Sequence, residues 1–211
     1  TAGMWPTEGV FVYAVDADTG KELWCNDSSG NIHVDLPHAL ARGFSGVAPQ
    51  GYLCASGNVL LVPTGRSVPA AFDITTGRLL YYKPEKTHYQ GAAYGGGVWC
   101  TATDDLFFHP NNRFHNPSEA RTGEIDPSPQ DGMIVYEFST GDQLSHMPGK
   151  YRILVDGETI YGIGQGTLDA FNLSTVRSKS RLSPADASWS VTHASRVYSM
   201  AVSGDVLLTG N

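Results

Sequence analysis

The sequence predicts an all-β fold built from many short antiparallel strands. Three observations predict it: short apolar runs alternate with polar turns, 24 glycines and 12 prolines occur among the 211 residues, and sustained helical periodicity is missing. Glycine and proline at this frequency are typical of strands joined by tight turns. With 41% hydrophobic and 17% charged residues, the chain has enough apolar side chains for a globular core.

The first predicted element is a hairpin at 12–24, VYAVDADTGKELW, in which an Asp-Thr-Gly turn separates two apolar strands. Gly20 suits a tight turn that requires positive φ, and the threonine before it can bond the local backbone. The segment recurs as AAFDITTGRLLYY from Ala70, as IVYEFSTGDQLS from Ile134 and, without its glycine, as LDAFNLSTVRSK from Leu168. The hairpin is therefore one copy of a repeat.

A second series of hairpins precedes the later copies of the first, with a polar turn between two apolar strands. These hairpins begin at Gly51, Gly97, Lys150 and Val197, and their turns recur at about 50 residues. Two interleaved hairpins at one period make a four-stranded unit, and such units at about 40–50 residues are the signature of a β-propeller. We predict a β-propeller, or a propeller segment, of four-stranded antiparallel blades, with about four blades in a single domain at 1–211.

Two segments interrupt the strands. The strongest helical candidate, Val34–Phe44, is one or two turns long and is expected to bridge one blade to the next. A polar, proline-rich insertion at 109–132 separates the two hairpins of the third copy. Long loops on a rigid scaffold are where binding concentrates, so we expect partner contacts from His109, Arg113 and His115. The same histidines can instead be metal ligands or simply solvated, and the solvated insertion is favoured.

Arg66 is a further candidate for partner contact. It lies in PTGRSVP, a turn that flanking prolines make rigid. An arginine held in this way can anchor a carboxylate of a partner, or bond a loop carbonyl within its own chain.

The pattern Ala-x-Asp-x-x-Thr-Gly-Lys-x-x-Trp from Ala14 to Trp24 resembles the blade motif of PQQ-type propeller repeats. That family includes quinone-dependent alcohol dehydrogenases, non-enzymatic outer-membrane assembly lipoproteins and PQQ-binding-like proteins of the bacterial envelope. The stretch Ala48–Leu80 is most similar to these envelope members. The resemblance extends as a repeat pattern over nearly the whole chain, and only the first copy is a full match. It implies that the structural blade motif comprises Asp16, Gly20, Trp24, Asp73, Gly77, Tyr81 and Gly141.

In this family the tryptophan that ends the motif packs between adjacent blades. The resemblance implies this role for Trp24 and, in the second copy, for Tyr81. The third copy has Ser145 at this place, so other residues must hold that interface. The two ends of the chain are complementary half-units, which either close a small ring or mark a segment of a longer propeller. The segment is favoured, because family members usually have more blades.

The resemblance also implies what a quinone dehydrogenase would need: a catalytic aspartate, a calcium ion with PQQ, and often a disulfide between adjacent cysteines. The sequence has no Cys-Cys pair and no loop of alternating calcium ligands. Asp16 and Asp73 recur with the repeat, as does Glu137, which indicates structural acceptors rather than catalysts. We therefore expect no cofactor, and PQQ with calcium belongs to the alternative function only.

The three cysteines lack the spacing of a zinc site. Cys54 and Cys100 occupy equivalent positions in neighbouring copies. Such positions are expected to be too far apart for a disulfide, so both are predicted to be buried free thiols. Cys25 follows the blade tryptophan and is predicted to be exposed.

Charge narrows the choice of partner. A net charge of −7 argues against nucleic acid, because a phosphate backbone requires clustered Lys and Arg. The one basic run, Arg177–Arg181, is interpreted as a solvated turn. No run approaches the roughly 18 consecutive apolar residues of a membrane helix.

These observations favour a non-catalytic binding or scaffolding module of a bacterial envelope protein. The family resemblance implies a periplasmic or cell-surface location, with a protein or glycan as partner and with further blades or domains in a longer chain. The alternative is a fragment of a PQQ-dependent oxidoreductase.

Overall fold

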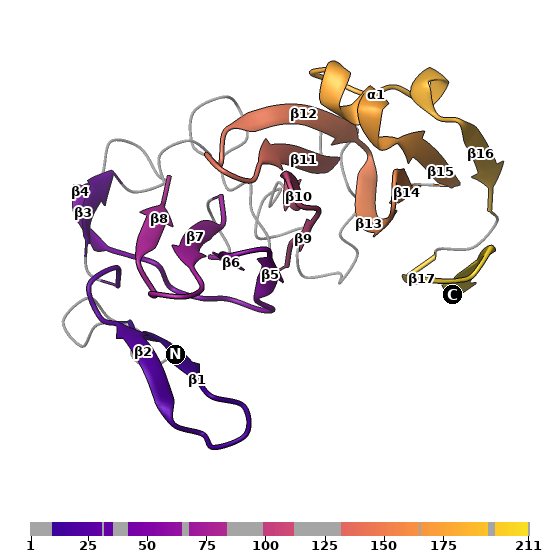
Figure 1. Cartoon of the computed structure of the whole chain (residues 1–211). Helices are drawn as coiled ribbons and strands as arrows, with labels where there is room; N and C mark the ends of the chain where they lie inside the picture. Colours follow the sequence, from indigo (N-terminus) through magenta and orange to yellow (C-terminus); the bar gives the residue numbers. More distant parts are fainter. Residues whose placement is uncertain are drawn as a thin grey trace, which may run out of the picture. The chain divides into compact units, whose positions relative to one another are not determined.

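The computed structural model describes residues 10–30, 32–35, 42–64, 68–83, 99–111, 132–164, 166–193 and 197–210. The chain divides into two compact units, Thr1–Cys100 (unit 1) and Thr101–Asn211 (unit 2). Antiparallel sheets make up most of both units, as Figure 1 shows.

Unit 1 holds two two-stranded sheets, β1-β2 and β3-β4, and one four-stranded sheet in the order β5-β6-β7-β8. The last sheet contains one hairpin of each predicted series, and β6 joins the two by pairing with β7. The strands are β1 (Val12–Val15), β2 (Glu22–Asn26), β3 (Ile32–Asp35), β4 (Arg42–Ser45), β5 (Cys54–Ser56), β6 (Val59–Val62), β7 (Ala70–Asp73) and β8 (Leu79–Tyr81).

Unit 2 contains two four-stranded sheets, β12-β11-β10-β9 and β13-β14-β15-β16, and the two-stranded sheet β17-β18. The prediction of four-stranded antiparallel blades is confirmed. The elements are β9 (Thr101–Ala102), β10 (Leu106–Asn111), β11 (Gly132–Glu137), β12 (Gln143–Pro148), β13 (Lys150–Asp156), β14 (Thr159–Gly164), β15 (Thr167–Asn172), α1 (Leu173–Ser178), η3 (Pro184–Asp186), β16 (Trp189–Thr192), β17 (Ser199–Ser203) and β18 (Val206–Gly210).

The Thr-Gly turns of the repeat are held by local hydrogen bonds. Asp16 accepts from the backbone N–H of Thr19 at 2.8 Å and from its hydroxyl at 2.6 Å. Gly20 donates its N–H to the Asp16 carbonyl at 2.8 Å, and its φ of 68° lies in the left-handed region. Asp73 and Gly77 repeat this arrangement in the β7–β8 turn, with a φ of 70° at the glycine. In the third copy Gly141 donates to the Glu137 carbonyl.

Two local predictions were wrong. The ends of the segment Val34–Phe44, expected to be helical, belong to the strands β3 and β4, which pair with each other, and its middle, 36–41, lies outside the described residues. In the fourth copy, α1 stands where the sequence predicted a hairpin turn. Val176 there replaces the glycine, and Asn172 caps the helix by accepting from the Ser174 N–H at 2.9 Å.

The core lies between the sheets of each unit. In unit 1, Val12 of β1 packs with Val47, Val62 and Phe72, and Trp24 lies against this cluster. In unit 2 the rings of Phe107 and Tyr136, which lie on the neighbouring strands β10 and β11, stack with centroids 4.8 Å apart. In unit 1 the apolar cluster joins the sheet β1-β2 to the sheet β5-β6-β7-β8, and such burial stabilises antiparallel sheets.

Candidate functional site

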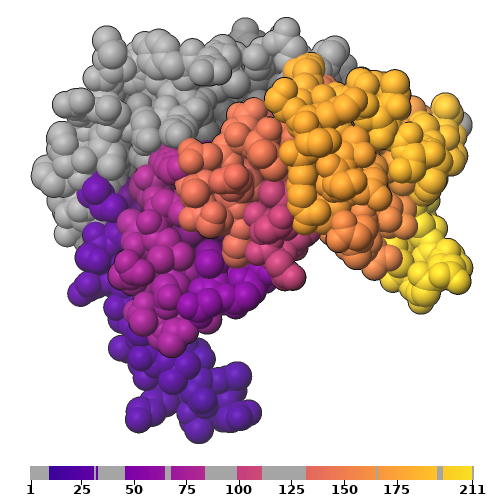
Figure 2. All heavy atoms as spheres, turned by 45° about the horizontal axis from the view of Figure 1, so that its top comes forward, coloured from indigo at the N-terminus to yellow at the C-terminus, as the bar shows by residue number. Residues whose placement is uncertain are grey.

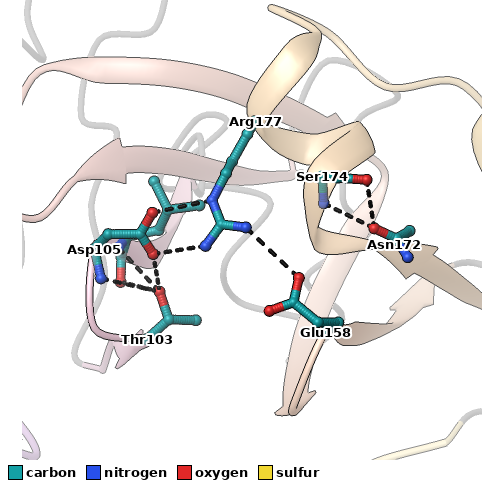
Figure 3. A network of polar contacts seen from close by, with 7 residues as sticks. Thr103, Asp105, Glu158, Asn172, Ser174 and Arg177 are labelled. Atoms are coloured by element: carbon teal, nitrogen blue, oxygen red, sulfur yellow. Dashed lines mark hydrogen bonds and ion pairs between the residues drawn. The ribbon is translucent and has the colours of Figure 1, made fainter.

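Arg177 of α1 connects two hairpin turns of unit 2 (Figure 3). Its Nε donates to Asp105 Oδ2 at 3.0 Å and its Nη2 donates to Oδ1 at 2.9 Å, so the pair is bidentate. Its Nη1 lies 3.7 Å from Glu158 Oε2. Asp105 belongs to the β9–β10 turn and Glu158 to the β13–β14 turn. The guanidinium therefore links two successive sheets.

The environment of Asp105 keeps it ionised. The hydrogen bond from Arg177 lowers the pKa of this carboxyl, and the hydroxyl of Thr103, which donates at 3.0 Å, adds to the effect. The α1 region lies at the surface of unit 2 (Figure 2), and Arg177 is 37% exposed. Solvent therefore screens the pair, and its contribution to stability is modest. The basic run Arg177–Arg181 is exposed, as predicted, but Arg177 lies in α1 rather than in a turn and forms an ion pair.

We expect Arg177→Ala to lower the free energy of unfolding by about 1 kcal/mol, since one exposed bidentate pair is lost. Arg177→Lys should recover little, because an ammonium group cannot reproduce the two parallel hydrogen bonds. Urea unfolding followed by circular dichroism measures the difference. Glu158→Gln is the matched control, with a smaller expected cost. Equal losses for Arg177→Ala and Glu158→Gln would contradict a specific Asp105 contact.

The interface that lacks the blade tryptophan is held by backbone bonds. Ser145 occupies the tryptophan position on β12, and its neighbour His146 pairs with the chain that follows α1. His146 donates its N–H to the Ser180 carbonyl at 3.1 Å, and its own carbonyl accepts from Leu182 at 2.8 Å. The Nη1 of Arg181 lies 3.0 Å from His146 Nδ1. Arginine can only donate, so Nδ1 is the acceptor and the imidazole is neutral.

Burial of His146, followed by the charge of Arg181, lowers its pKa to about 4. The unfolded chain binds the proton near pH 6.5, so stability from this neutral imidazole is present above that pH and is lost as the pH falls towards 4.

We expect unfolding at pH 5 to require about 2 kcal/mol less free energy than at pH 7 on account of His146. The variant His146→Asn keeps an acceptor near the Nδ1 position but does not titrate. Its stability should therefore change less over this interval. Urea titrations of both proteins at the two pH values make the comparison. An unchanged pH dependence in His146→Asn would show that other groups cause the loss.

Unit 1 has a different contact between sheets. The indole Nε1 of Trp24 on β2 donates to the Ile74 carbonyl at 2.7 Å, and Asn26 donates to the Gly77 carbonyl at 2.7 Å. The indole ring lies against Gly77, where an added Cβ would be 2.3 Å from Trp24 Cε3. Gly77 is therefore required twice, for its positive φ and for the approach of the ring. The first hairpin docks through Trp24 onto the Thr-Gly turn of the next copy.

Among the described residues of unit 2, the most buried ion pair lies within one sheet. Lys150, the first residue of β13, forms an ion pair with Asp169 of β15. The two residues are 8% and 1% exposed. The lysine side chain crosses β14 over Gly162 and Gly164, where added Cβ atoms would lie 3.2 Å from its Cδ and 2.9 Å from its Nζ. These glycines leave the space that the lysine fills.

Hydroxyl groups complete the surroundings of Asp169. Lys150 Nζ also donates to Thr167 Oγ1 at 3.0 Å, and this hydroxyl donates to Asp169 Oδ2 at 3.1 Å. Ser190 of β16 donates to the other carboxylate oxygen. Burial alone would raise the pKa of Asp169, but the hydrogen bonds from Lys150 and Ser190 outweigh it and the pKa is lowered. A carboxylate with this donor set is a weak base, which suits a structural role better than proton abstraction.

The structure describes one of the four residues that the sequence predicted for partner contact. Arg66, Arg113 and His115 lie outside the described residues. His109 lies in β10 opposite Ile134 and is 1% exposed, so it belongs to the core rather than to the polar insertion. The strands extend to Asn111 and begin again at Gly132, which narrows the insertion to 112–131.

The contacts of Lys150, Asp169, His146 and Arg177 were missed by sequence reasoning. Within the described part of the chain, no three His, Cys, Asp or Glu side chains gather as metal ligands would. No helix in that part is both long and apolar enough to span a membrane.

The repeated four-stranded antiparallel sheets, each made of two hairpins in sequence order, define a propeller-like all-β protein. No family model and no curated protein sequence matches the chain.

Solved structures do match it. The chain is similar to BamB from Moraxella catarrhalis, with 12% identity, 94% of this chain and 48% of that chain covered, and a TM-score of 0.55. It is also similar to the computationally designed Ika8 protein, with 14% identity, coverage of 93% and 48%, and a TM-score of 0.52. A europium-containing methanol dehydrogenase matches with 17% identity, coverage of 79% and 37%, and a TM-score of 0.46. The chain spans about half the length of the first two proteins, and at these identities the likeness concerns the fold.

Proposed function

We propose that this chain is a non-catalytic binding or scaffolding module of a bacterial envelope protein. The observation that carries the proposal is that charged side chains in unit 2 form ion pairs that hold the sheets together. Asp105 and Arg177 join two sheets, and Asp169 and Lys150 join two strands of one sheet. These charged groups stabilise the sheets. The pKa values of both carboxyls, Asp105 and Asp169, are lowered, as expected for carboxylates that remain ionised in an ion pair.

The envelope location rests on the repeat motif from Ala14 to Trp24, which resembles that of envelope propeller proteins. The likeness of the fold to BamB is in keeping with it. A rigid set of blades presents loops at its edges, and partner contact is proposed for the insertion at 112–131 and for Arg66. The partner is a protein or a glycan. Exposed apolar side chains such as Trp189 and Val191 on β16 offer additional contact area.

The first experiment separates this function from a quinone-dependent oxidoreductase. Purified, folded chain is titrated with PQQ in the presence and absence of calcium, and binding is followed by tryptophan fluorescence. We expect no saturable binding. Calcium-dependent binding in the micromolar range would overturn the proposal and would assign the chain to the oxidoreductases instead.

The second experiment tests the binding role directly. Asn111 pairs with Gly132 across β10 and β11, so the segment 112–131 can be replaced with an Asn-Gly turn that closes the hairpin. Wild type, this deletion and a variant with the segment scrambled are used for affinity capture from bacterial envelope extract. We expect one set of partners with the wild type that both variants lose while staying folded by circular dichroism. Equal capture by all three would contradict partner contact through the insertion.

A further inference from the structure

The two-stranded sheets β1-β2 and β17-β18, here called the half-sheets, have complementary edges. In each four-stranded sheet, the second strand of one hairpin pairs with the first strand of the segment that repeats 12–24. These pairs are β6 with β7, β10 with β11 and β14 with β15. The sheet β17-β18 corresponds to the first partner and β1-β2 to the second. Among the described strands, β18 pairs only with β17 and β1 only with β2. Each half-sheet therefore offers the edge that the other kind of hairpin covers in a complete sheet.

Side chains that a complete sheet buries are exposed in the half-sheets. Val15 of β1 is 57% exposed, whereas Phe72, at the same place in the second copy of the repeat, is 0% exposed. Leu208 of β18 is 54% exposed, whereas Leu61, at the same place in β6, is 0% exposed. Joining the two kinds of edge would remove this apolar surface from water, which favours association.

The complete sheets fix the register in which the two edges can pair. Val59, the first residue of β6, lies opposite Asp73, the last residue of β7. The first residues of β10 and β14 lie opposite the last residues of β11 and β15 in the same way. In the half-sheets the equivalent residues are Val206, which begins β18, and Asp16, which follows β1. This one pair determines the register of all the others.

A backbone hydrogen bond recurs beside each of these pairs. Ile74 donates its N–H to the Asn58 carbonyl at 2.9 Å, and the two other complete sheets have the equivalent bond at 2.8 Å. The bond joins the turn of one hairpin to the turn of the next. In the half-sheets the equivalent groups are the N–H of Ala17 and the carbonyl of Asp205.

We propose that β18 of one copy of this chain pairs with β1 of a second copy, so that two chains form a symmetric dimer through two such joints. In each joint Leu207 lies opposite Val15, and Leu208 lies opposite Ala14. A two-fold axis lets both chains cover both edges, so the assembly closes at two copies. The chain spans about half the length of BamB and Ika8, and two copies together have the length of one such protein.

One residue weakens the proposed joint. In the complete sheet of unit 1, Asp73 accepts from the Asn58 side chain at 2.8 Å through Oδ2, while its Oδ1 caps the turn. Asp16 caps its own turn through Oδ1 in the same way. The residue equivalent to Asn58 is Asp205, whose carboxylate repels that of Asp16 across the joint. Asp205→Asn should replace this repulsion with the hydrogen bond that Asn58 makes.

Sedimentation equilibrium over a range of concentrations measures the dimer. We expect the wild-type chain to form a dimer that dissociates on dilution. Asp205→Asn should lower the Kd by about tenfold or more, because each joint gains a hydrogen bond to a charged group. Val15→Lys should raise it by about tenfold or more, because it places a charge where complete sheets bury apolar side chains. Circular dichroism checks that each variant is folded.

The matched control for Val15→Lys is Leu23→Lys on the same hairpin. Leu23 is exposed, and Leu80, at the same place in the complete sheet of unit 1, is exposed as well. The Kd of Leu23→Lys should therefore match that of the wild type. A wild-type chain that stays monomeric at every concentration, or that forms open-ended polymers, would overturn the proposal. Equal effects of Val15→Lys and Leu23→Lys, or an unchanged Kd for Asp205→Asn, would overturn it as well.

Cross-linking tests the register and the origin of the partner strand. One chain carries Ala14→Cys and a second, differently tagged chain carries Leu208→Cys, and both lack the native cysteines. Opposed residues of an antiparallel pair are within reach of a disulfide, so mild oxidation should link the two tags. Leu207→Cys is the matched control, because its side chain lies on the other face of the strand. Equal linking from both positions, or none from Leu208→Cys, as when β18 pairs with β1 of its own chain, would overturn the proposal.

Discussion

Replacing Asp169 with alanine should lower the free energy of unfolding of unit 2 by about 3–5 kcal/mol. The change leaves the ammonium group of Lys150 buried without its counter-charge, which costs far more than the loss of the pair itself. Lys150 is only 8% exposed and has the Thr167 hydroxyl as its other partner. Urea unfolding monitored by circular dichroism measures the loss.

A double variant separates charge from packing. Lys150→Met/Asp169→Leu removes both charges and keeps similar volumes, so we expect it to recover most of the stability that Asp169→Ala loses. Asp169→Asn, which keeps the shape and an acceptor, should fall between the wild type and Asp169→Ala. A double variant that is as unstable as Asp169→Ala would contradict an isolated buried charge as the cause.

Replacing Trp24 with alanine should lower the stability of unit 1 by about 3 kcal/mol. The change removes the ring from its place against Gly77 and deletes the hydrogen bond to the Ile74 carbonyl. Trp24→Phe, which keeps an aromatic ring but has no N–H donor, should lose about half as much. Thermal unfolding followed by circular dichroism measures both variants.

The neighbouring residue supplies the control for Trp24. Leu23 lies next to it on β2 and is 64% exposed, so Leu23→Ala should change stability by less than about 0.5 kcal/mol. Similar losses for Leu23→Ala and Trp24→Ala would mean that β2 itself, rather than the docked indole, is the sensitive element.

The repeat could be predicted from sequence because its turns are local. The bonds from Thr19 to Asp16 and from Thr76 to Asp73 span only three positions, and the glycines that end these turns have positive φ. The prediction for the fourth copy failed because its turn residues differ. With valine at position 176 the turn cannot form, and an asparagine cap favours α1 instead.

Contacts between distant residues could not be predicted. Lys150 reaches Asp169 across β14, and only the absence of side chains at Gly162 and Gly164 permits it. Arg177 meets Asp105 because a helix replaces a turn, which the repeat pattern did not predict. Such pairs depend on the register and spacing of whole sheets, and these are properties of the assembled unit rather than of a short motif.

The two kinds of contact between sheets have opposite dependence on the solution around them. In unit 1, Trp24 joins two sheets through buried apolar surface and a hydrogen bond between neutral groups. Concentrated salts such as sulfate strengthen contacts of that kind. The interface in unit 2 includes an exposed charge pair, Arg177 with Asp105, beside its backbone bonds, and ions in solution screen that pair. A high concentration of such a salt is therefore expected to strengthen the Trp24 contact of unit 1 and to weaken the Arg177–Asp105 pair of unit 2.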